Sequence, residues 1–312
     1  MSDNPIRAPV KTPTALEQEI TAACKAGILL DRRMDMPRPP AGTVMPWPKR
    51  QLSDILGVCV HQSFSKTRDP AKTAAYHTSK NNHITPGRPL PSIAYDFAIS
   101  PDDSRAMLVS EPLDRKYAQG SEKSPGDENL ALLSIEVLGK FLAPGVSKAR
   151  NPDAEDGPSQ QQMDSLWRLI HWCQATFGFG AEGLFYHADF LSKPGCPGFA
   201  LMKSVEDVRD ASTLVIATDL EAEIALQRWN TLAMAHGVDG VLDSNDKRAL
   251  VKFQKEHRLH TTGILDHFTR LKLDRYLHQP APSLPIGRGP VPPSAAVRPE
   301  RPLPRRIRSL LR

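Results

Sequence analysis

A nearly continuous apolar run, Leu130-Ala-Leu-Leu-Ser-Ile-Glu-Val-Leu138, constrains the fold of this chain more than any other stretch. Its length fits a strand, and a strand that is apolar on both sides is normally covered on both faces. We therefore expect it to lie at the centre of a sheet. Its one carboxylate, Glu136, needs a partner when it is buried there, and such a partner can be catalytic.

Two other apolar runs each end in a histidine. The first, residues 55–61, ends at His61, and the second, residues 183–187, ends at His187. A Gly- and Pro-rich segment that contains Cys196 follows the second. Imidazole nitrogen and thiolate sulfur are ligands that Zn²⁺ takes readily, and three protein ligands with one open position are typical of a catalytic zinc site. These three residues therefore predict a zinc site.

Each of these residues also has a plainer interpretation. A single His at the end of an apolar strand is more often a buried structural side chain, and a Cys between turns is more often a small buried apolar residue. Cys59 is another candidate ligand, because it lies two residues before His61 on the same face of the strand. His77, His83 and His171 lack metal-binding spacing, and we interpret them as non-ligands.

The order of these residues resembles the zinc-dependent N-acetylmuramoyl-L-alanine amidases of the peptidoglycan-recognition type, which include short phage lysozyme-like amidases. In that family the first ligand His closes an early strand, and the second opens a segment that ends in Lys-x-Cys-Pro. Here Lys193 lies six residues after His187. Cys196 lies nine residues after it, one more than is usual in the phage enzymes.

Two further segments carry the same resemblance. Ile93-Ala-Tyr-Asp-Phe-Ala-Ile99 resembles the family strand that carries a Tyr at the site, here Tyr95. Ser134-Ile-Glu-Val-Leu-Gly139 resembles a strand on which some members carry a catalytic Glu, here Glu136. The resemblance covers residues 50–205, and four matches in family order are more specific than any one of them.

The resemblance implies an α/β fold with a central mixed β-sheet flanked by helices. It implies Zn²⁺ held by His61, His187 and Cys196, and cleavage of the amide between N-acetylmuramic acid and L-alanine. We expect a phage or prophage endolysin, with a secreted antibacterial effector as a close variant. The alternative class is a non-catalytic peptidoglycan-binding protein, a type that typically loses the Cys.

Amide hydrolysis also needs a base for the water and a donor for the developing oxyanion. By resemblance, Glu136 is the first candidate base. Tyr95 is the alternative, either as polariser of water or as oxyanion donor. Lys193 is a point charge that would stabilise the tetrahedral intermediate.

Residues 219–279 have a helical pattern that differs from the preceding part. Apolar residues recur at helical spacing around Trp229 and Phe253, and the turn Gly237-Val-Asp-Gly240 separates the two helices. Thr262-Gly263 leads into a third helix that begins near Asp266. The pattern resembles the three-helix peptidoglycan-binding domain found beside many wall hydrolases, and Asp243 is suited to cap the second helix.

The remaining boundaries follow composition. Residues 1–50 combine a helix at 14–24 with a Pro-rich segment at 36–48 that we interpret as a linker. The amidase domain is then expected at 51–212, and a Pro- and Arg-rich basic tail at 280–312.

The positive charge of the chain is concentrated in this tail. Residues 278–312 hold seven Arg and one Glu, a net charge of +6, whereas the whole chain carries +5. The folded parts are therefore nearly neutral, and we expect no nucleic-acid partner and a monomer. Ile307, Leu310 and Leu311 would share one face of a short helix, opposite the arginines, which suits an anionic envelope surface.

The chain has neither an apolar run of eighteen residues nor an apolar N-terminal region typical of a signal peptide. We expect synthesis in the bacterial cytoplasm and action in the periplasm or cell wall after release. Four Cys without paired spacing do not indicate a disulfide framework.

Overall fold

The computed structural model describes residues 13–119, 128–190, 195–210, 219–229, 242–257, 259 and 261–277. All of them belong to one unit, Met1–Gln279. Lys193, the predicted turn at 237–240 and the predicted tail at 280–312 lie outside the described residues. Within the described ranges, no helix is both long and apolar enough to cross a membrane.

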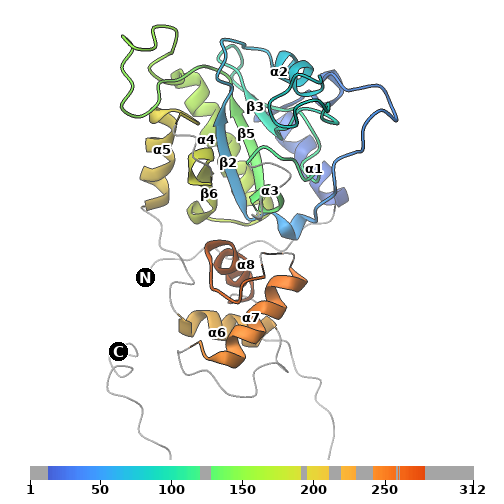
Figure 1. Ribbon diagram of the computed structural model, residues 1–312, viewed down its shortest axis with the longest axis vertical. Coiled ribbons are helices and arrows are strands. Elements are labelled where there is room, and N and C mark those ends of the chain that lie inside the picture. Colours follow the sequence, from blue (N-terminus) through green and yellow to red (C-terminus); the bar gives the residue numbers. More distant parts are fainter. Residues whose placement is uncertain are drawn as a thin grey trace, which may run out of the picture. The chain divides into compact units, whose positions relative to one another are not determined.

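The main element is a six-stranded sheet with the strand order β1-β4-β3-β5-β2-β6 (Figure 1). β3 and β4 are antiparallel, and all other neighbours are parallel. The predicted mixed sheet is thus confirmed. The strands are β1 Leu29–Asp31, β2 Gly57–Gln62, β3 Phe97–Ile99, β4 Ala106–Leu108, β5 Leu132–Val137 and β6 Leu184–Tyr186.

Strand β5 is central, as its sequence predicts, because it pairs with β3 on one side and β2 on the other. The apolar run that contains it starts earlier, in the single helical turn α3, Glu128–Ala131. Strand β3 is shorter than the predicted strand at 93–99, and Tyr95 therefore precedes it.

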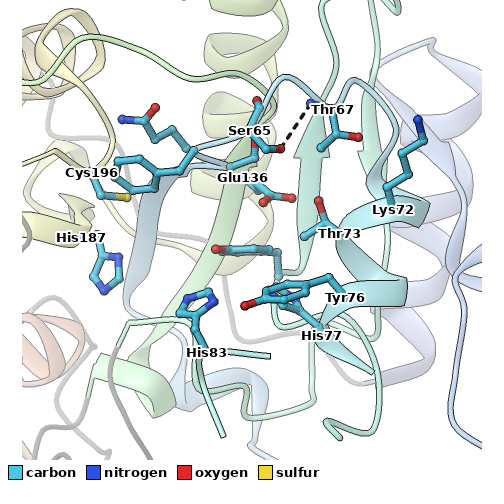
Figure 2. Close-up of a pocket in the computed structure, with 14 residues that line it drawn as sticks. Ser65, Thr67, Lys72, Thr73, Tyr76, His77, His83, Glu136, His187 and Cys196 are labelled. Atoms are coloured by element: carbon cyan, nitrogen blue, oxygen red, sulfur yellow. Dashed lines mark hydrogen bonds between the residues drawn. The ribbon is translucent and has the colours of Figure 1, made fainter. Parts of the chain in front are cut away.

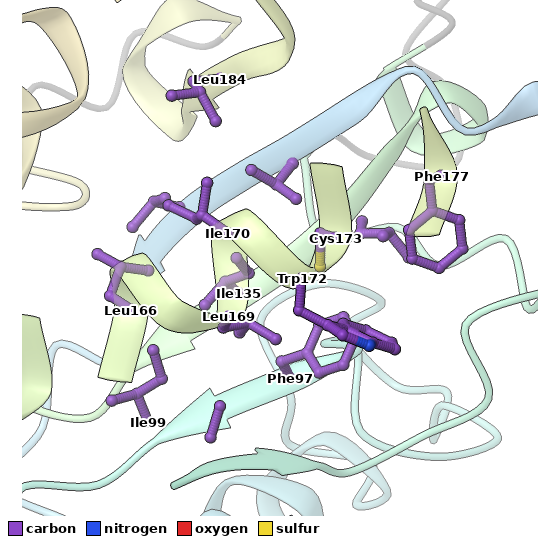
Figure 3. Close-up of a cluster of buried hydrophobic side chains, with 14 of the residues drawn as sticks. Phe97, Ile99, Ile135, Leu166, Leu169, Ile170, Trp172, Cys173, Phe177 and Leu184 are labelled. Carbon is purple, nitrogen blue, oxygen red and sulfur yellow. The ribbon is translucent and has the colours of Figure 1, made fainter. Parts of the chain in front are cut away.

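One face of the sheet is mostly apolar. Alternate strand residues point to it, including Val58, Val60, Phe97, Ile135 and Val137, and they pack under helices α1 (Pro13–Lys25), α4 (Gln160–Phe177) and α5 (Phe199–Asp210). Figure 3 shows α4 lying across the strands with Leu166, Leu169, Ile170 and Cys173 turned towards them. The three helices therefore hold the strands in place through this apolar face.

Helix α4 has a defined cap at each end. Ser159 and Gln162 form a capping box at its start, and Gly178 closes it in the left-handed conformation with φ 72°.

The opposite face carries the polar side chains. The residues between the core positions are Cys59 and His61 on β2, and Ser134 and Glu136 on β5. Helix α2, Pro70–His77, lies on this side, and Asp69 caps it by accepting a hydrogen bond from the Ala71 N–H at 3.0 Å. This face therefore presents the candidate site residues.

Residues 13–50 belong to the sheet unit. Helix α1 contributes Leu16, Ile20 and Ala23 to the apolar core, and β1 pairs with β4. Trp47 is buried in the segment predicted as a linker, and its indole N–H donates to Ser92 Oγ at 2.8 Å. Helix α1 agrees with the helix predicted at 14–24, and β1 adds an edge strand to the sheet.

The C-terminal helices α6 (Asp219–Trp229), α7 (Ser244–Glu256) and α8 (His267–Leu277) share an apolar core that contains Leu226, Leu250, Phe253 and Leu273. Asp243 caps α7 as predicted and accepts hydrogen bonds from Asn245 N and Asp246 N. Short 3-10 helices cover Arg33–Asp35, Leu52–Asp54, Ala181–Gly183 and His187–Asp189.

Candidate metal centre

The candidate ligands gather where three parallel strands end. His61 on β2 lies opposite Glu136 on β5, and Val60 lies opposite Tyr186 on β6, which places His187 directly beyond the paired region. The carboxyl ends of parallel strands meet at one edge of a sheet, where ligand sites commonly form. The fold therefore brings together residues that are 126 positions apart in the chain.

A glycine permits the close approach of the two histidine-bearing strands. A Cβ added to Gly57, at the start of β2, would lie 2.1 Å from the carbonyl oxygen of Gly183. Any side chain there would force β2 away from β6 and separate His61 from His187.

Three potential ligand atoms converge at this edge. His61 Nδ1 lies 3.1 Å from His187 Nδ1, and Cys196 Sγ lies 3.9 Å from His61 Nδ1. All three residues are buried, and their ligand atoms lie within 4.8 Å of one another. Among the described residues, this is the one group of three or more His, Cys, Asp or Glu side chains placed to hold a metal ion.

This donor set fits zinc. Zn–N distances of about 2.0 Å and Zn–S distances of about 2.3 Å in a tetrahedron place two nitrogens about 3.3 Å apart and a nitrogen about 3.5 Å from a sulfur. The separations of 3.1 Å between the two Nδ1 atoms and 3.9 Å between Cys196 Sγ and His61 Nδ1 are close to these values. Since two imidazole nitrogens and a sulfur point at one another in a buried space, a cation or proton between them is needed to offset the repulsion of their lone pairs.

The segment that carries Cys196 is tied to strand β2. The Gln62 side chain accepts a hydrogen bond from Phe141 N at 2.6 Å and donates one to the carbonyl oxygen of Gly195. Ala188 N donates to the carbonyl oxygen of Cys196 at 3.2 Å. The thiol is thus positioned by contacts with both histidine-bearing segments.

Glu136 lies opposite His61 in the sheet and lines the same cleft as His187 and Cys196 (Figure 2). Its Oε2 is buried and has no hydrogen-bond partner within the described part of the chain, while the carboxyl group is hydrogen-bonded to Thr73 of helix α2. Burial raises the pKa of Glu136 to about 8, and the bond to Thr73 opposes this shift. Its pKa therefore lies near neutral pH, as suits an acid–base catalyst.

Tyr95 packs against the first ligand. Its ring centroid lies 5.2 Å from that of His61, and its carbonyl oxygen accepts a hydrogen bond from Ser110 Oγ at 2.6 Å. Burial raises the pKa of the Tyr95 phenol well above its usual value, and the nearby Glu136 and Cys196 add to the shift. The phenol therefore stays protonated and able to donate.

His77 on helix α2 orients the segment that carries Tyr95. Its Nδ1 accepts a hydrogen bond from Ala94 N at 3.2 Å, and the His77 and Tyr95 rings lie 5.6 Å apart. Burial lowers the pKa of His77 to about 3, with a further contribution from His83. The ring is thus neutral in the native protein and has a structural role.

The cleft has a volume of about 570 Å³. Its walls include Phe64 and Lys72, the ligands His187 and Cys196, and the aromatic pair Tyr76 and His83, whose rings stack at 5.9 Å. Thr73, Tyr76 and His77 all come from α2 and line the cleft, and Figure 2 shows Thr73 beside Glu136.

The structure brings together all the described residues that the sequence singles out for the site. Cys59 is not part of the ligand group, because it is buried in an apolar cluster with Leu132 and Phe185. His171 is exposed on α4, as expected for a non-ligand. Thr73 and Phe64 line the cleft although no sequence motif points to them. Of the four Cys, none forms a disulfide.

Several solved structures are similar to this chain. Drosophila PGRP-LB is 16% identical, with a TM-score of 0.38 over 57% of this chain and 92% of PGRP-LB. The catalytic domain of XlyA is 14% identical, with a TM-score of 0.40 over 58% and 97%. A mutant endolysin from Bacillus subtilis is 13% identical, with a TM-score of 0.40 over 58% and 96%.

No protein-family model and no curated protein matches the sequence. The structural neighbours are thus peptidoglycan-recognition proteins and endolysin-type domains. Similarity at this level does not define an activity, which has to be argued from the site itself.

Proposed function

We propose that this chain is a zinc-dependent peptidoglycan amidase that cleaves the amide between N-acetylmuramic acid and L-alanine. The observation that carries the proposal is the convergence of His61, His187 and Cys196 at the edge of the sheet, where His187, Cys196 and the buried carboxyl group of Glu136 line an open cleft. His187 and Cys196 line this cleft, so a metal ion held by the three ligands would have a position open to water or substrate, which distinguishes a catalytic zinc site from a closed structural one.

The complete ligand set favours the enzyme over a non-catalytic wall-binding protein. A protein that only binds the polymer needs a groove but no buried thiol and imidazole pair, since burying these groups without a cation is costly. The intact His, His and Cys set is thus better explained by catalysis.

Zinc at these ligands supplies Lewis acidity, which lowers the pKa of water and polarises an amide carbonyl. In this proposal Glu136 accepts the proton of the attacking water and delivers it to the leaving amine, a role supported by its position in the cleft. It must be ionised for the first step, and a divalent cation nearby favours the ionised form of a buried carboxyl group.

Tyr95 has a different role in this proposal. Its phenol remains protonated and lies against His61, so it is suited to donate a hydrogen bond to the oxyanion that develops on the carbonyl. Lys193 would add a positive charge to the same intermediate. Its resemblance to the family Lys supports that role.

We further propose that residues 219–279 hold the enzyme on the wall polymer. Their support is the resemblance of their sequence to a three-helix peptidoglycan-binding domain, together with the shared core of α6, α7 and α8. A second attachment raises the effective concentration of substrate. Such an arrangement suits both an endolysin and a secreted effector. The Arg-rich tail at 280–312 would add affinity for an anionic envelope surface.

The test is digestion of purified peptidoglycan by zinc-loaded and chelator-treated protein, followed by mass spectrometry. The expected products are stem peptides with a free L-alanine amino group and glycan strands without stem peptides. New reducing ends on the glycan would instead indicate a glycosidase. Digestion at full rate by metal-free protein would contradict the role of zinc.

A further inference from the structure

Phe64 occupies an unfavourable position at the rim of the cleft. It is a non-glycine residue with positive φ, 52°, and its side chain is 50% exposed. A bulky residue in the left-handed region costs on the order of 1–2 kcal/mol, and an exposed aromatic ring gains little from burial. Stability alone would favour Gly or Asn at this position.

The neighbouring residues hold Phe64 in this conformation. Ser63 Oγ donates to the carbonyl oxygen of Gly139 at 3.0 Å and accepts from Gly139 N at 2.9 Å. Ser65 Oγ accepts from Thr67 N at 3.3 Å, as the dashed line in Figure 2 shows. A strained residue persists only where its surroundings fix it, and such positions cluster at functional sites.

The ring of Phe64 lies beside the metal centre. A Cβ added to Gly195 would be 3.2 Å from Phe64 Cε1, so the ring lies over the backbone directly before Cys196. Phe64 also follows His61 by three residues, and it lines the same cleft as His187 and Cys196. A flat apolar surface is thus presented within the cleft, next to where the scissile amide would lie.

The two walls of the cleft differ in chemistry. Helix α2 supplies Lys72 and the hydroxyl of Thr73, a cationic and hydrogen-bonding surface suited to the carboxylates of a stem peptide. The segment after β2 supplies the Phe64 ring between two serines. In the amide-linked substrate the muramic acid carboxyl is consumed, so the sugar is uncharged, and the C–H groups of a pyranose ring pack favourably on an aromatic face.

We propose that Phe64 is a specificity-determining residue that stacks on the pyranose ring of N-acetylmuramic acid. This inference rests on the proposed function and adds the sugar subsite to it. Phe64 acts in binding and not in the chemical step, because its side chain has no group that can exchange a proton.

The test compares two substrates that share the scissile amide: a muramyl peptide, and a D-lactyl peptide that lacks the sugar ring. Phe64→Ala should raise KM for the muramyl peptide about tenfold, leave its kcat within about twofold, and leave both constants for the lactyl peptide unchanged. Phe64→Tyr should retain the wild-type KM. Equal effects on both substrates, or no effect on either, would overturn the proposal.

Two further variants separate binding from folding. Phe64→Gly relieves the positive φ, so it should be at least as stable as the wild type and still show the raised KM. Phe199→Ala is the matched control, because Phe199 is 54% exposed and does not line the cleft. It should leave KM unchanged, and a KM increase equal to that of Phe64→Ala would contradict the assignment.

If the wild-type protein cleaves neither substrate, the proposed function fails and the sugar subsite can still be tested. Saturation-transfer NMR with the peptide-free glycan disaccharide should then show transfer to the sugar ring protons in the wild type and Phe199→Ala, and its loss in Phe64→Ala. Equal transfer in both variants would refute the sugar subsite.

Discussion

Two groups of buried polar side chains lie on this sheet, and they differ in how their charges are paired. In the first, the Asp96 carboxylate accepts hydrogen bonds from Lys116 Nζ at 2.5 Å, Ser134 N at 2.8 Å and Arg50 Nη2 at 3.3 Å. Arg50 donates further to the carbonyl oxygens of Leu132 and Pro112. Each buried charge in this group has several partners.

The second group is the candidate metal centre, where potential metal ligands converge on one another. His61, His187 and Cys196 converge on one another, and Glu136 has one oxygen without a hydrogen-bond partner within the described residues. A buried carboxyl group without a charged partner tends to be neutral, which agrees with its raised pKa. We infer from this difference in charge pairing that the Asp96 group stabilises the fold, whereas the candidate metal centre is arranged to bind a ligand.

The largest predicted effect concerns the ligand group. His61→Ala, His187→Ala and Cys196→Ser should each abolish peptidoglycan hydrolysis, because three protein ligands are the minimum for such a zinc site. Each variant should still unfold cooperatively, as circular dichroism can show. If all three variants failed to fold, the metal centre would also be needed for stability, and it would not differ in this respect from the Asp96 group.

The paired group should respond in the opposite way. Asp96→Ala leaves Arg50 and Lys116 buried without their carboxylate, so it should lower the free energy of unfolding by about 3–5 kcal/mol. Urea denaturation measures this change. A loss below about 1 kcal/mol would show that Asp96 does not stabilise the fold through these partners.

Glu136→Gln should reduce the hydrolysis rate on the order of a hundredfold with zinc content unchanged, the usual scale for a lost general base. Stability should be little affected, since the substitution removes a buried ionisable group. If this variant retains full activity while Tyr95→Phe is severely impaired, the leading catalytic role belongs to Tyr95.

His77 should make stability depend on pH. Its pKa is lowered to about 3 in the folded protein from 6.5, so the unfolded chain binds an additional proton between these values. The His77 contribution is thus complete above pH 6.5 and is lost as pH falls towards 3, by about 1.4 kcal/mol per pH unit. His77→Gln should flatten this slope, whereas replacement of the exposed His83 by Gln should retain most of it.

The sequence predicts the metal ligands because strand ends are local signals and parallel strands bring their carboxyl ends to one edge. Glu136 is predictable for the same reason, as the one carboxylate in an apolar run. Phe64 and Thr73 are not predictable in this way. Phe64 lies in the segment after β2 and Thr73 in the first turn of α2, and both reach the cleft only through tertiary packing. Strand β1 is missed since three residues show no usable periodicity, and the neighbouring prolines favour a linker.

The central claim is that His61, His187 and Cys196 bind one metal ion through two imidazoles and a thiolate. The most direct measurement is the metal content and absorption spectrum of the cobalt-substituted full-length protein, compared with Cys196→Ser and Cys59→Ser. We predict about one ion per chain and a thiolate-to-cobalt charge-transfer band that Cys196→Ser loses and Cys59→Ser, altered at a buried Cys on the same strand as His61, retains. Equal spectra for the two variants, or no stoichiometric metal binding by the wild type, would contradict the account.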